Sequence, residues 1–405
     1  MDLLKIITRE EPIIGIEISD SNIRLAFLNY KKDKKSRNAK ENGIEARCLA
    51  ETDLPDGAIV SGKIADRKIL IERLGNLLKK VKPKIKYAII SIPYDNVYSK
   101  LFSFPNTLNK ERLADTMRTV ADFQIPLSGK DSYIDWEEES DKDNSLAFLA
   151  AAPKKIIDDY MSAVMEAGIS PVAIEPHQMS IVRAIRPEPG SVLSSVSGKN
   201  GLLIFIFRNS VIRFSRFFPY AFLLKKKSAD DEIRKVADFY ESDNEKIISR
   251  MAIDKKNPAK TKINFIERLE LTEEARNNGE KWIGAIGAAL RGVMPRSEDV
   301  LVSLMPVGTE EAYESHKAIA FTKFIANTIA AISLFFVFVY FASWFLIISI
   351  GKNFSNHISA LNTSPLQYDA AKLENDAAKF NELVGSTADI LDTMPEWSLL
   401  LEELK

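Results

Sequence analysis

The sequence predicts a mixed α/β protein that is followed by a single membrane-spanning helix and a helical stalk. Three observations predict this order. Short β-branched runs alternate with amphipathic stretches up to about residue 295. The 28 residues from Phe324 to Gly351 carry no charged side chain, and about 20 apolar residues suffice to cross a hydrocarbon core. Beyond them, apolar residues recur at heptad spacing.

Composition excludes several functional classes. The 405 residues include 55 basic and 56 acidic side chains, and this balance excludes the global basic field of a dedicated nucleic-acid binder. Cys48 is the single cysteine, so an intramolecular disulfide framework is excluded. His177, His316 and His357 lie far apart in the sequence, and no metal site is predicted.

The first half of the α/β part opens with a predicted hairpin. IIGIEI (13–18) and NIRLAFLNY (22–30) are β-branched runs separated by a turn-like SDS. Apolar residues at helical spacing predict a helix over 66–81. Strands are predicted at 87–93 and 97–105, and a helix at 109–124.

Two polar segments in this half have a structural and a functional interpretation. The basic segment 31–43 is predicted to be a solvated loop, and a patch for lipid headgroups or nucleic acid is the alternative. The acidic run at 135–144, DWEEESDKDN, is predicted to be a solvated hairpin tip between strands around 134 and 146, with acid/base catalysis as its alternative.

The same alternation continues in the second half. The alanine-rich run 145–153 predicts a strand, 154–168 an amphipathic helix that Gly168 closes, and 170–176 another strand. GLLIFIF (201–207) and VIRFSRFF (211–218) predict a second hairpin around RNS. Helices are predicted at 228–242 and, with several glycines, at 280–292.

Two hairpins followed by a glycine-containing helix resemble the nucleotide site of the actin-like ATPases. More specifically, the order of five motifs over residues of about 10 to 295 resembles the type IV pilus assembly protein PilM family. These motifs are GIEISDSNIRLAFL, AIISIPYDNVYSKLFSFP, LAFLAAAPKKIIDDYMSAVMEAGISPVAIEP, GLLIFIF and IGAIGAALRG. The resemblance implies a two-lobed actin-like ATPase fold of the PilM and FtsA type.

The resemblance also implies a nucleotide site in which hairpin tips offer backbone N–H groups to phosphate and a carboxylate holds Mg²⁺. Its residues would be Glu17, Ser19, Asp20, Ser21 and Asn22 at the first tip, Arg208, Asn209 and Ser210 at the second, and Gly284 and Gly287 on the adenosine-side helix.

This sequence departs from the family pattern at both tips. Ser19 replaces a glycine at the first tip, whereas Glu17 keeps the carboxylate. At the second tip, Phe205 and Phe207 stand at the carboxylate and glycine positions, and phenylalanine cannot ligate hydrated Mg²⁺. We therefore expect a degenerate site that binds ATP and Mg²⁺ weakly or not at all, with no catalytic residue, no required cofactor and no hydrolysis.

A second resemblance begins after residue 298. Val302, Ser303, Leu304, Met305 and Pro306 resemble the I-N-L-L-P leader by which PilN docks on PilM. The same run can also be a final strand of the domain, and the two interpretations are compatible because a docked peptide often extends a sheet edge.

The segment beyond the membrane span predicts a pairing helix. Four- and three-residue steps separate the seam positions Leu366, Ala370, Leu373, Ala377, Phe380, Val384, Thr387 and Leu391. PEWSLLLEELK (395–405) resembles the PilN segment that leads into a ferredoxin-like periplasmic domain, so we expect the chain to be cut before such a domain; a protein that keeps only the stalk is the alternative.

Together these features predict four regions. They are a PilM-like cytoplasmic domain (1–298), a PilN-like leader and linker (299–322), a transmembrane helix (323–351) and a periplasmic stalk (352–405). Nine acidic and three basic residues follow Lys352, so this tail carries −6 and the preceding residues +5. The N-terminus has no signal core, so we expect a bacterial inner-membrane protein with a cytoplasmic N-terminus and a periplasmic C-terminus.

The resemblances imply a non-catalytic scaffold, a PilM–PilN fusion in a type IV pilus machine. Implied partners are a PilO-like membrane protein at the span and stalk, a PilN-like or self leader, cytoplasmic motor ATPases or a platform protein, and further copies in a homo- or hetero-oligomer. One alternative is a GspL-like platform protein of type II secretion. The other is an FtsA-like, nucleotide-dependent, membrane-tethered ATPase.

Overall fold

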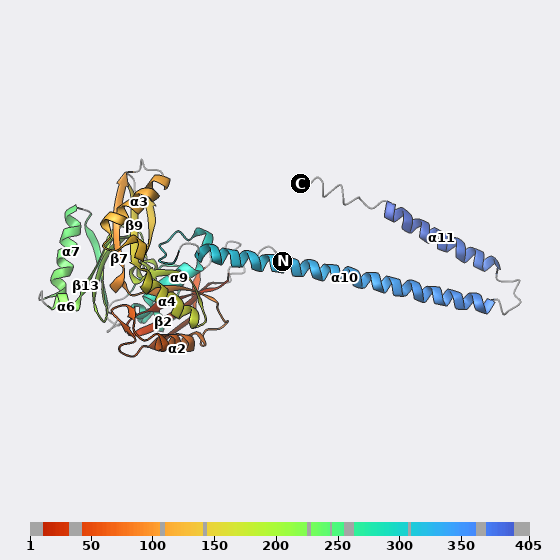
Figure 1. Ribbon diagram of the computed structural model, residues 1–405, viewed down its shortest axis with the longest axis horizontal. Coiled ribbons are helices and arrows are strands. Elements are labelled where there is room, and N and C mark those ends of the chain that lie inside the picture. The colour runs from red at the N-terminus through yellow and green to blue at the C-terminus, as the bar shows by residue number, and fades with distance from the viewer. Residues whose placement is uncertain are drawn as a thin grey trace. The chain divides into compact units, whose positions relative to one another are not determined.

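The computed structural model consists of two units, Met1–Lys317 and Ala318–Lys405, and the first is a layered α/β domain (Figure 1). The structure describes residues 11–31, 43–105, 110–140, 144–224, 228–243, 245–254, 263–306, 309–361 and 370–392. Most of the basic segment 31–43, whose function the sequence left open, therefore lies outside the described residues.

A six-stranded sheet forms the centre of the first lobe, in the order β10-β6-β1-β2-β3-β15. The strands are β1 (Ile13–Ile18), β2 (Asn22–Tyr30), β3 (Ile44–Asp53), β6 (Tyr87–Ile92), β10 (Ser170–Pro176) and β15 (Leu269–Glu270). β1 runs antiparallel to β2 and parallel to β6, with Ile16 opposite both Leu25 and Ile90. All six residues of β1 are buried, because helices cover both faces of the sheet.

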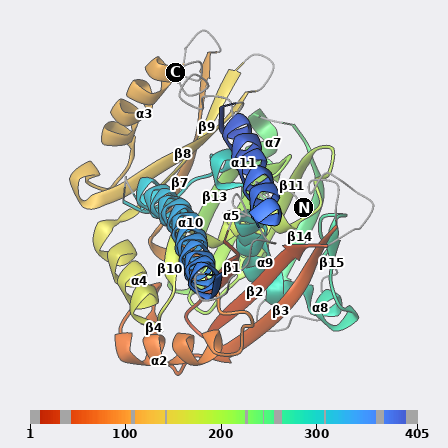
Figure 2. The same ribbon diagram turned by 90° about the vertical axis from the view of Figure 1, so that its right-hand side faces the viewer.

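Two pairs of helices provide this cover. α5 (His177–Ala184) and α9 (Gly279–Val293) pack on one face, and α2 (Arg67–Leu78) and α4 (Lys154–Glu166) pack together on the other (Figure 2). α2 begins where the Asp66 carboxylate accepts the Ile69 N–H, and α4 ends before Gly168, which has a φ of +99°. The predicted helices and strands of this lobe are confirmed.

The second lobe contains a four-stranded sheet in the order β13-β12-β11-β14. The strands are β11 (Ser191–Ser197), β12 (Gly201–Arg208), β13 (Val211–Pro219) and β14 (Ile247–Asp254). α7 (Ala229–Asp243) packs on β12. The predicted hairpin β12–β13 is present, but β11 was missed because its serine-rich sequence, SVLSSVS, gives no apolar alternation. This omission changes the position of the second tip.

A three-stranded sheet in the order β7-β9-β8 extends the first lobe under α3 (Lys110–Gln124), as Figure 1 shows. The strands are β7 (Tyr98–Pro105), β8 (Ser132–Ser140) and β9 (Asn144–Pro153). Glu137, Glu138 and Glu139 lie within β8, so the prediction that they form a hairpin tip is wrong. The cross-strand partners on β9 extend the ladder through all three glutamates. Smaller elements are β4 (Ile59–Val60), β5 (Lys63–Ile64), α6 (Tyr220–Leu223) and α8 (Glu273–Asn277).

Two long helices follow, α10 (Thr309–Leu361) and α11 (Ala370–Asp392). Among the described residues, one stretch is long and apolar enough to cross a membrane, Ile325–Ile358, with a mean hydropathy of 2.4. α11 carries the predicted heptad seam from Ala370 onwards, whereas Leu366 lies outside the described residues. Phe380 and Val384 on this seam are exposed.

Candidate functional site

The first tip, the turn between β1 and β2, is closed by its own side chains. Ser19 Oγ donates to the Asn22 carbonyl at 2.9 Å, and the Asn22 N–H donates to Ser19 Oγ at 3.1 Å. Asp20 is buried and accepts the Gly62 N–H at 3.1 Å. Ser21 joins the turn to the end of β3 through its carbonyl, which accepts the Leu54 N–H. The tip is therefore rigid and tied to its own lobe.

The turn that faces this tip is the one between β11 and β12, residues 198–200. Asn200 Nδ2 contacts Asp20 Oδ2 and donates to Asp95 Oδ1 at 2.8 Å. Lys199 Nζ pairs with Asp56 at 2.5 Å. Burial raises the pKa of the Asp95 carboxyl, and the Asn200 hydrogen bond lowers it in part. Protein side chains therefore bridge the two lobes beside the first tip, where the resemblance implies a nucleotide phosphate.

Tyr94 fills the space beside this contact. Its ring is buried and packs at 5.1 Å from the ring of Phe217 in the second lobe. A Cβ at Gly198 would lie 2.6 Å from the Tyr94 hydroxyl oxygen. Burial raises the pKa of the Tyr94 hydroxyl, so it stays protonated and neutral.

Arg208, Asn209 and Ser210 do not reach the first tip, and the prediction that they form the second tip is wrong. They lie at the other end of β12, roughly 25 Å from the 198–200 turn along an eight-residue strand. Arg208 pairs there with Glu245 at 3.1 Å. Phe205 and Phe207 are core residues. The cause is the missed strand β11, which forms the lobe-facing hairpin with β12.

Ser195 of β11 takes the position in the second lobe that Glu17 takes in the first. Glu17 is followed by Ile18, Ser19 and the tip; Ser195 is followed by Val196, Ser197 and the 198–200 turn. A serine hydroxyl is a weaker ligand for Mg²⁺ or its water shell than a carboxylate.

Glu17 and two glycines of α9, Gly284 and Gly287, lie where elements of the first lobe pack closely together. Glu17 is fully buried, and Arg24 Nη1 lies 3.9 Å from its carboxylate. A Cβ at Gly284 would lie 2.5 Å from Glu17 Oε2, and one at Gly287 would lie 1.7 Å from the Ser180 carbonyl oxygen. The structure thus brings Glu17 and Gly284 together, and both glycines let α9 lie close to its neighbours.

The second candidate site holds residues 299–306, which we call the seated segment. Val302 and Leu304 are fully buried, and Met305 is 9% exposed. The Ser303 N–H donates to Asp135 Oδ2 of β8 at 2.7 Å, and the Leu304 N–H donates to the Ile174 carbonyl of β10 at 2.8 Å. The segment is not a strand, so the alternative of a final strand is wrong. It lies between β8 and β10 and is held largely by side chains.

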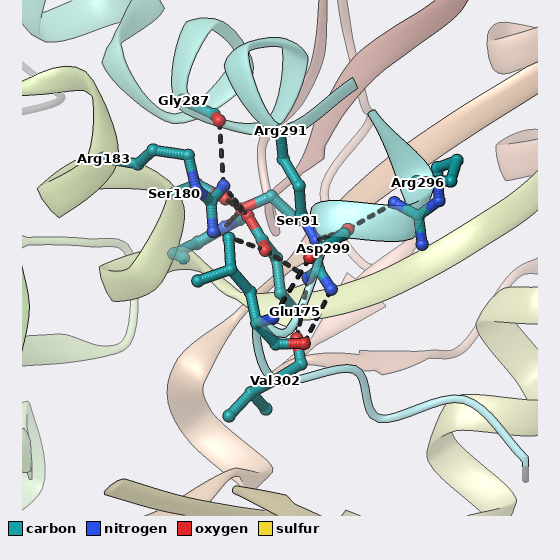
Figure 3. A network of polar contacts seen from close by, with 11 residues as sticks. Ser91, Glu175, Ser180, Arg183, Gly287, Arg291, Arg296, Asp299 and Val302 are labelled. Carbon is teal, nitrogen blue, oxygen red and sulfur yellow. Dashed lines mark hydrogen bonds and ion pairs between the residues drawn. The ribbon is translucent and has the colours of Figure 1, made fainter. Parts of the chain in front are cut away.

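Arg291 of α9 binds the seated segment through hydrogen bonds, as Figure 3 shows. Its side chain is fully buried. Nη1 donates to the Val302 carbonyl at 2.7 Å and Nη2 to the Leu301 carbonyl at 2.8 Å. Nη1 also donates to Glu175 Oε2 at 2.7 Å. One guanidinium therefore joins α9, β10 and the seated segment.

Glu175, the penultimate residue of β10, holds two arginines. Arg183 Nη1 and Nη2 donate to its two oxygens at 2.6 and 2.8 Å. Ser180 Oγ lies 2.5 Å from Oε1. Complete burial opposes ionisation of Glu175, but Arg183 and Arg291 outweigh it and lower its pKa to about 2. Glu175 is a permanent anion at neutral pH.

Asp299 supplies the second anion and begins the seated segment. Its Oδ2 accepts Arg291 Nε at 2.7 Å and also contacts Arg296 Nη1. Its Oδ1 accepts the Leu301 N–H at 3.1 Å, which turns the chain into the groove.

Glu137 of β8 lies on the other side of Val302. The Val302 backbone N–H donates to its carboxylate, whereas Oε2 is buried without a hydrogen-bond partner among the described residues. Burial raises the pKa of Glu137 to about 7, although Arg183 and Arg291 pull it down. This carboxyl therefore changes charge near neutral pH.

The sequence predicted the seated segment but missed the residues that hold it. Glu175 and Arg291 lay inside the quoted motifs AIEP and IGAIGAALRG without a role. The signal was available, because a charged residue inside an otherwise apolar buried strand or helix requires a partner of opposite charge.

Comparisons with known proteins agree on the fold of the first unit. Residues 15–193 match the family model for type IV pilus assembly protein PilM. A solved PilM–PilN type IV pilus biogenesis complex is similar at a TM-score of 0.52 and 15% identity, over 70% of this chain and 99% of that chain. At that identity the likeness shows the fold alone. A comparison with curated proteins found no match to the chain.

Two further solved structures are similar at TM-scores below 0.5. The cytoplasmic domain of EpsL, an inner-membrane component of the Vibrio cholerae type II secretion system, has a TM-score of 0.37 and 9% identity, over 64% of this chain and 85% of that one. The ethanolamine utilization protein EutJ of Carboxydothermus hydrogenoformans has a TM-score of 0.36 and 12% identity, over 70% of this chain and 90% of that chain. Over residues 15–193 the chain is therefore similar to PilM, and the first unit has a PilM-like, actin-like fold.

Proposed function

We propose that this chain is a non-catalytic, membrane-anchored scaffold of a type IV pilus machine, in which a PilM-like domain is fused to the leader, span and stalk of a PilN-like partner. The observation that carries the proposal is the clamp of Arg291 on the Leu301 and Val302 carbonyls. The clamp holds the segment that leads into the apolar helix α10.

The fusion accounts for the departures of the leader from the family pattern. A segment on the same chain has a high effective concentration at its groove, so a weak match suffices for docking. Here the arginine binds main-chain carbonyls, which every sequence offers, and only Val302, Leu304 and Met305 fill apolar space. Docked in their groove, the leader residues 302–306 therefore connect the domain to the membrane-spanning helix.

The remaining partners follow from this arrangement. The exposed apolar seam of α11 suits a PilO-like helix in the periplasm, and the cytoplasmic domain offers a surface to motor ATPases or a platform protein. The proposed orientation places the N-terminus in the cytoplasm and the stalk beyond the inner membrane. A GspL-type platform protein of type II secretion combines the same parts in one chain, and capture of a secreted exoprotein instead of a pilin would favour it.

The nucleotide site is proposed to be degenerate. Glu17 is used in packing under α9, Ser195 stands at the corresponding position of the second lobe, and Asn200 bridges the lobes. An FtsA-like ATPase would need both tips open to phosphate.

The first prediction concerns the seat. Val302→Asp places a charge in an apolar groove and should release the seated segment, so that a labelled peptide of residues 298–307 binds the full-length variant in detergent with a Kd on the order of 10 μM. Val300→Asp is the matched control, since Val300 is 78% exposed in the same segment. Fluorescence anisotropy should show no peptide binding to wild type or to this control. Binding of the peptide to wild type with equal affinity would show that the groove is empty.

The second prediction concerns nucleotide. Calorimetric titration of the full chain with Mg·ATP should give no binding up to about 1 mM, because side chains already bridge the tips. Asn200→Ala removes the bridge without adding bulk, and it should leave the result unchanged because Ser195 still lacks a carboxylate. A micromolar Kd for wild type would contradict the degenerate site.

The third prediction concerns pH. The folded-state pKa of Glu137, about 7, is raised above its ordinary 4.5, so its stabilising contribution is complete below pH 4.5 and is lost as the pH rises through 7. Urea unfolding of the first unit should therefore show wild type losing roughly 2–3 kcal/mol more than Glu137→Gln between pH 5 and 8.5. Glu138→Gln, at the exposed neighbouring position, should behave as wild type. Parallel pH curves for wild type and Glu137→Gln would contradict this assignment.

A further inference from the structure

A lysine-rich loop between α2 and β6 takes no part in either site. Residues 79–86 read KKVKPKIK, and Val81 and Ile85 are each 6% exposed. These two buried residues fix the loop to the core, so that its charges have defined positions. The exposed cations, which we call the lysine patch, are Lys79, Lys80, Lys82, Lys84 and Lys86.

The lysine patch keeps a positive charge after its neighbours are counted. Glu11 pairs with Lys86 at 3.1 Å. Glu72 and Glu166 line a cavity of about 630 Å³ together with Lys79 and Lys84. Glu166 also pairs with Arg67 at 2.9 Å, so five lysines and this arginine against three glutamates leave +3. Lys80 and Lys82 have no ion-pair partner within the described part of the chain. The glutamates disfavour an anion inside the cavity, so the patch acts through its outer surface.

The lysine patch lies at the edge of the six-stranded sheet opposite to the tips. β1, β6 and β10 run parallel and start at Ile13, Tyr87 and Ser170. Lys86 directly precedes β6, whereas Ser19–Ser21 follow the far end of β1. The patch and the bridged tips therefore face in opposite directions.

The chain itself limits how far this domain can move from the apolar helix. The seated segment ends at Pro306, and the apolar stretch begins at Ile325. Residues 309–325 belong to α10, and seventeen helical residues rise only about 26 Å. So short a connection keeps the domain close to the surface of the membrane that the apolar helix is proposed to span.

We propose that the lysine patch binds the anionic surface of the membrane that the apolar helix spans, through contacts of its ammonium groups with lipid phosphates. The inference rests on the membrane anchor of the proposed function. Bound in this way, the domain presents the tips, at the opposite edge, to the cytoplasm.

The chemistry of the loop favours lipid over a soluble acidic protein. Lysine is a hydrated point charge that suits a diffuse layer of phosphates, whereas bidentate recognition of one phosphate uses arginine. A protein partner also needs a buried apolar centre. Between the exposed lysines of 79–86, Pro83 is the one exposed apolar residue.

The test is lysine footprinting of the full chain in nanodiscs made of phosphatidylcholine alone or of phosphatidylcholine and phosphatidylglycerol at 7:3. Acetylation rates at the lysine patch, read by mass spectrometry, should fall at least threefold with phosphatidylglycerol and recover in 0.5 M NaCl. Lys63, Lys68, Lys130 and Lys155 are exposed elsewhere and should change less than 1.5-fold.

Lys86 serves as the reporter in two matched variants. K79Q/K80Q/K82Q/K84Q should abolish the protection of Lys86, whereas K63Q/K68Q/K130Q/K155Q should retain it. Equal acetylation rates at the lysine patch in both lipid compositions would overturn the proposed lipid contact. That result would favour a soluble acidic partner for the loop. A chain that fails to co-purify with nanodiscs overturns the anchor, and with it this inference. The two failures are therefore distinguishable.

Discussion

The position of the seated segment depends on the buried guanidinium of Arg291. A fully buried cation costs several kcal/mol unless it is paired and hydrogen-bonded. Its two carbonyl partners, Leu301 and Val302, and its carboxylate partner Asp299 lie beyond residue 298, outside the PilM-like lobes. α9 therefore satisfies its arginine only when the seated segment is in place. The segment is thus a structural part of the domain that it leaves.

A series of side-chain contacts runs from the residues that hold the seated segment towards the first tip and the 198–200 turn. Ser180 Oγ lies 2.5 Å from Glu175 and 3.0 Å from Ser91 Oγ. Ser91 Oγ is 2.9 Å from His177 Nδ1, and the His177 ring stacks edge-on at 6.1 Å from Tyr94. Tyr94 in turn packs on Phe217 of the second lobe. A continuous buried series therefore connects the segment that leads to α10 with the contact between lobes, which suits a scaffold better than an open nucleotide cleft.

Much of this fold could be predicted from sequence, because β-branched runs such as IIGIEI and the helix stop at Gly168 carry local signals. The main error came from SVLSSVS, whose serines hide a buried strand; the second tip was consequently placed at Arg208 instead of at 198–200. Val302 and Leu304 were found through the resemblance of residues 302–306 to the PilN leader, whereas Glu175, Arg183 and Arg291 were missed. Pairing across 116 residues, from Glu175 to Arg291, leaves no periodic pattern in a single sequence.

Hydrogen exchange at the Leu304 amide tests the central claim, that the seated segment is built into the domain, most directly. This N–H donates to the Ile174 carbonyl and is covered by a fully buried side chain. In the full chain in detergent, its exchange should be slowed to within about tenfold of the β6 amides, because it opens only with the core. Exchange within seconds, while β6 stays protected, would show that the segment is free and would contradict the account.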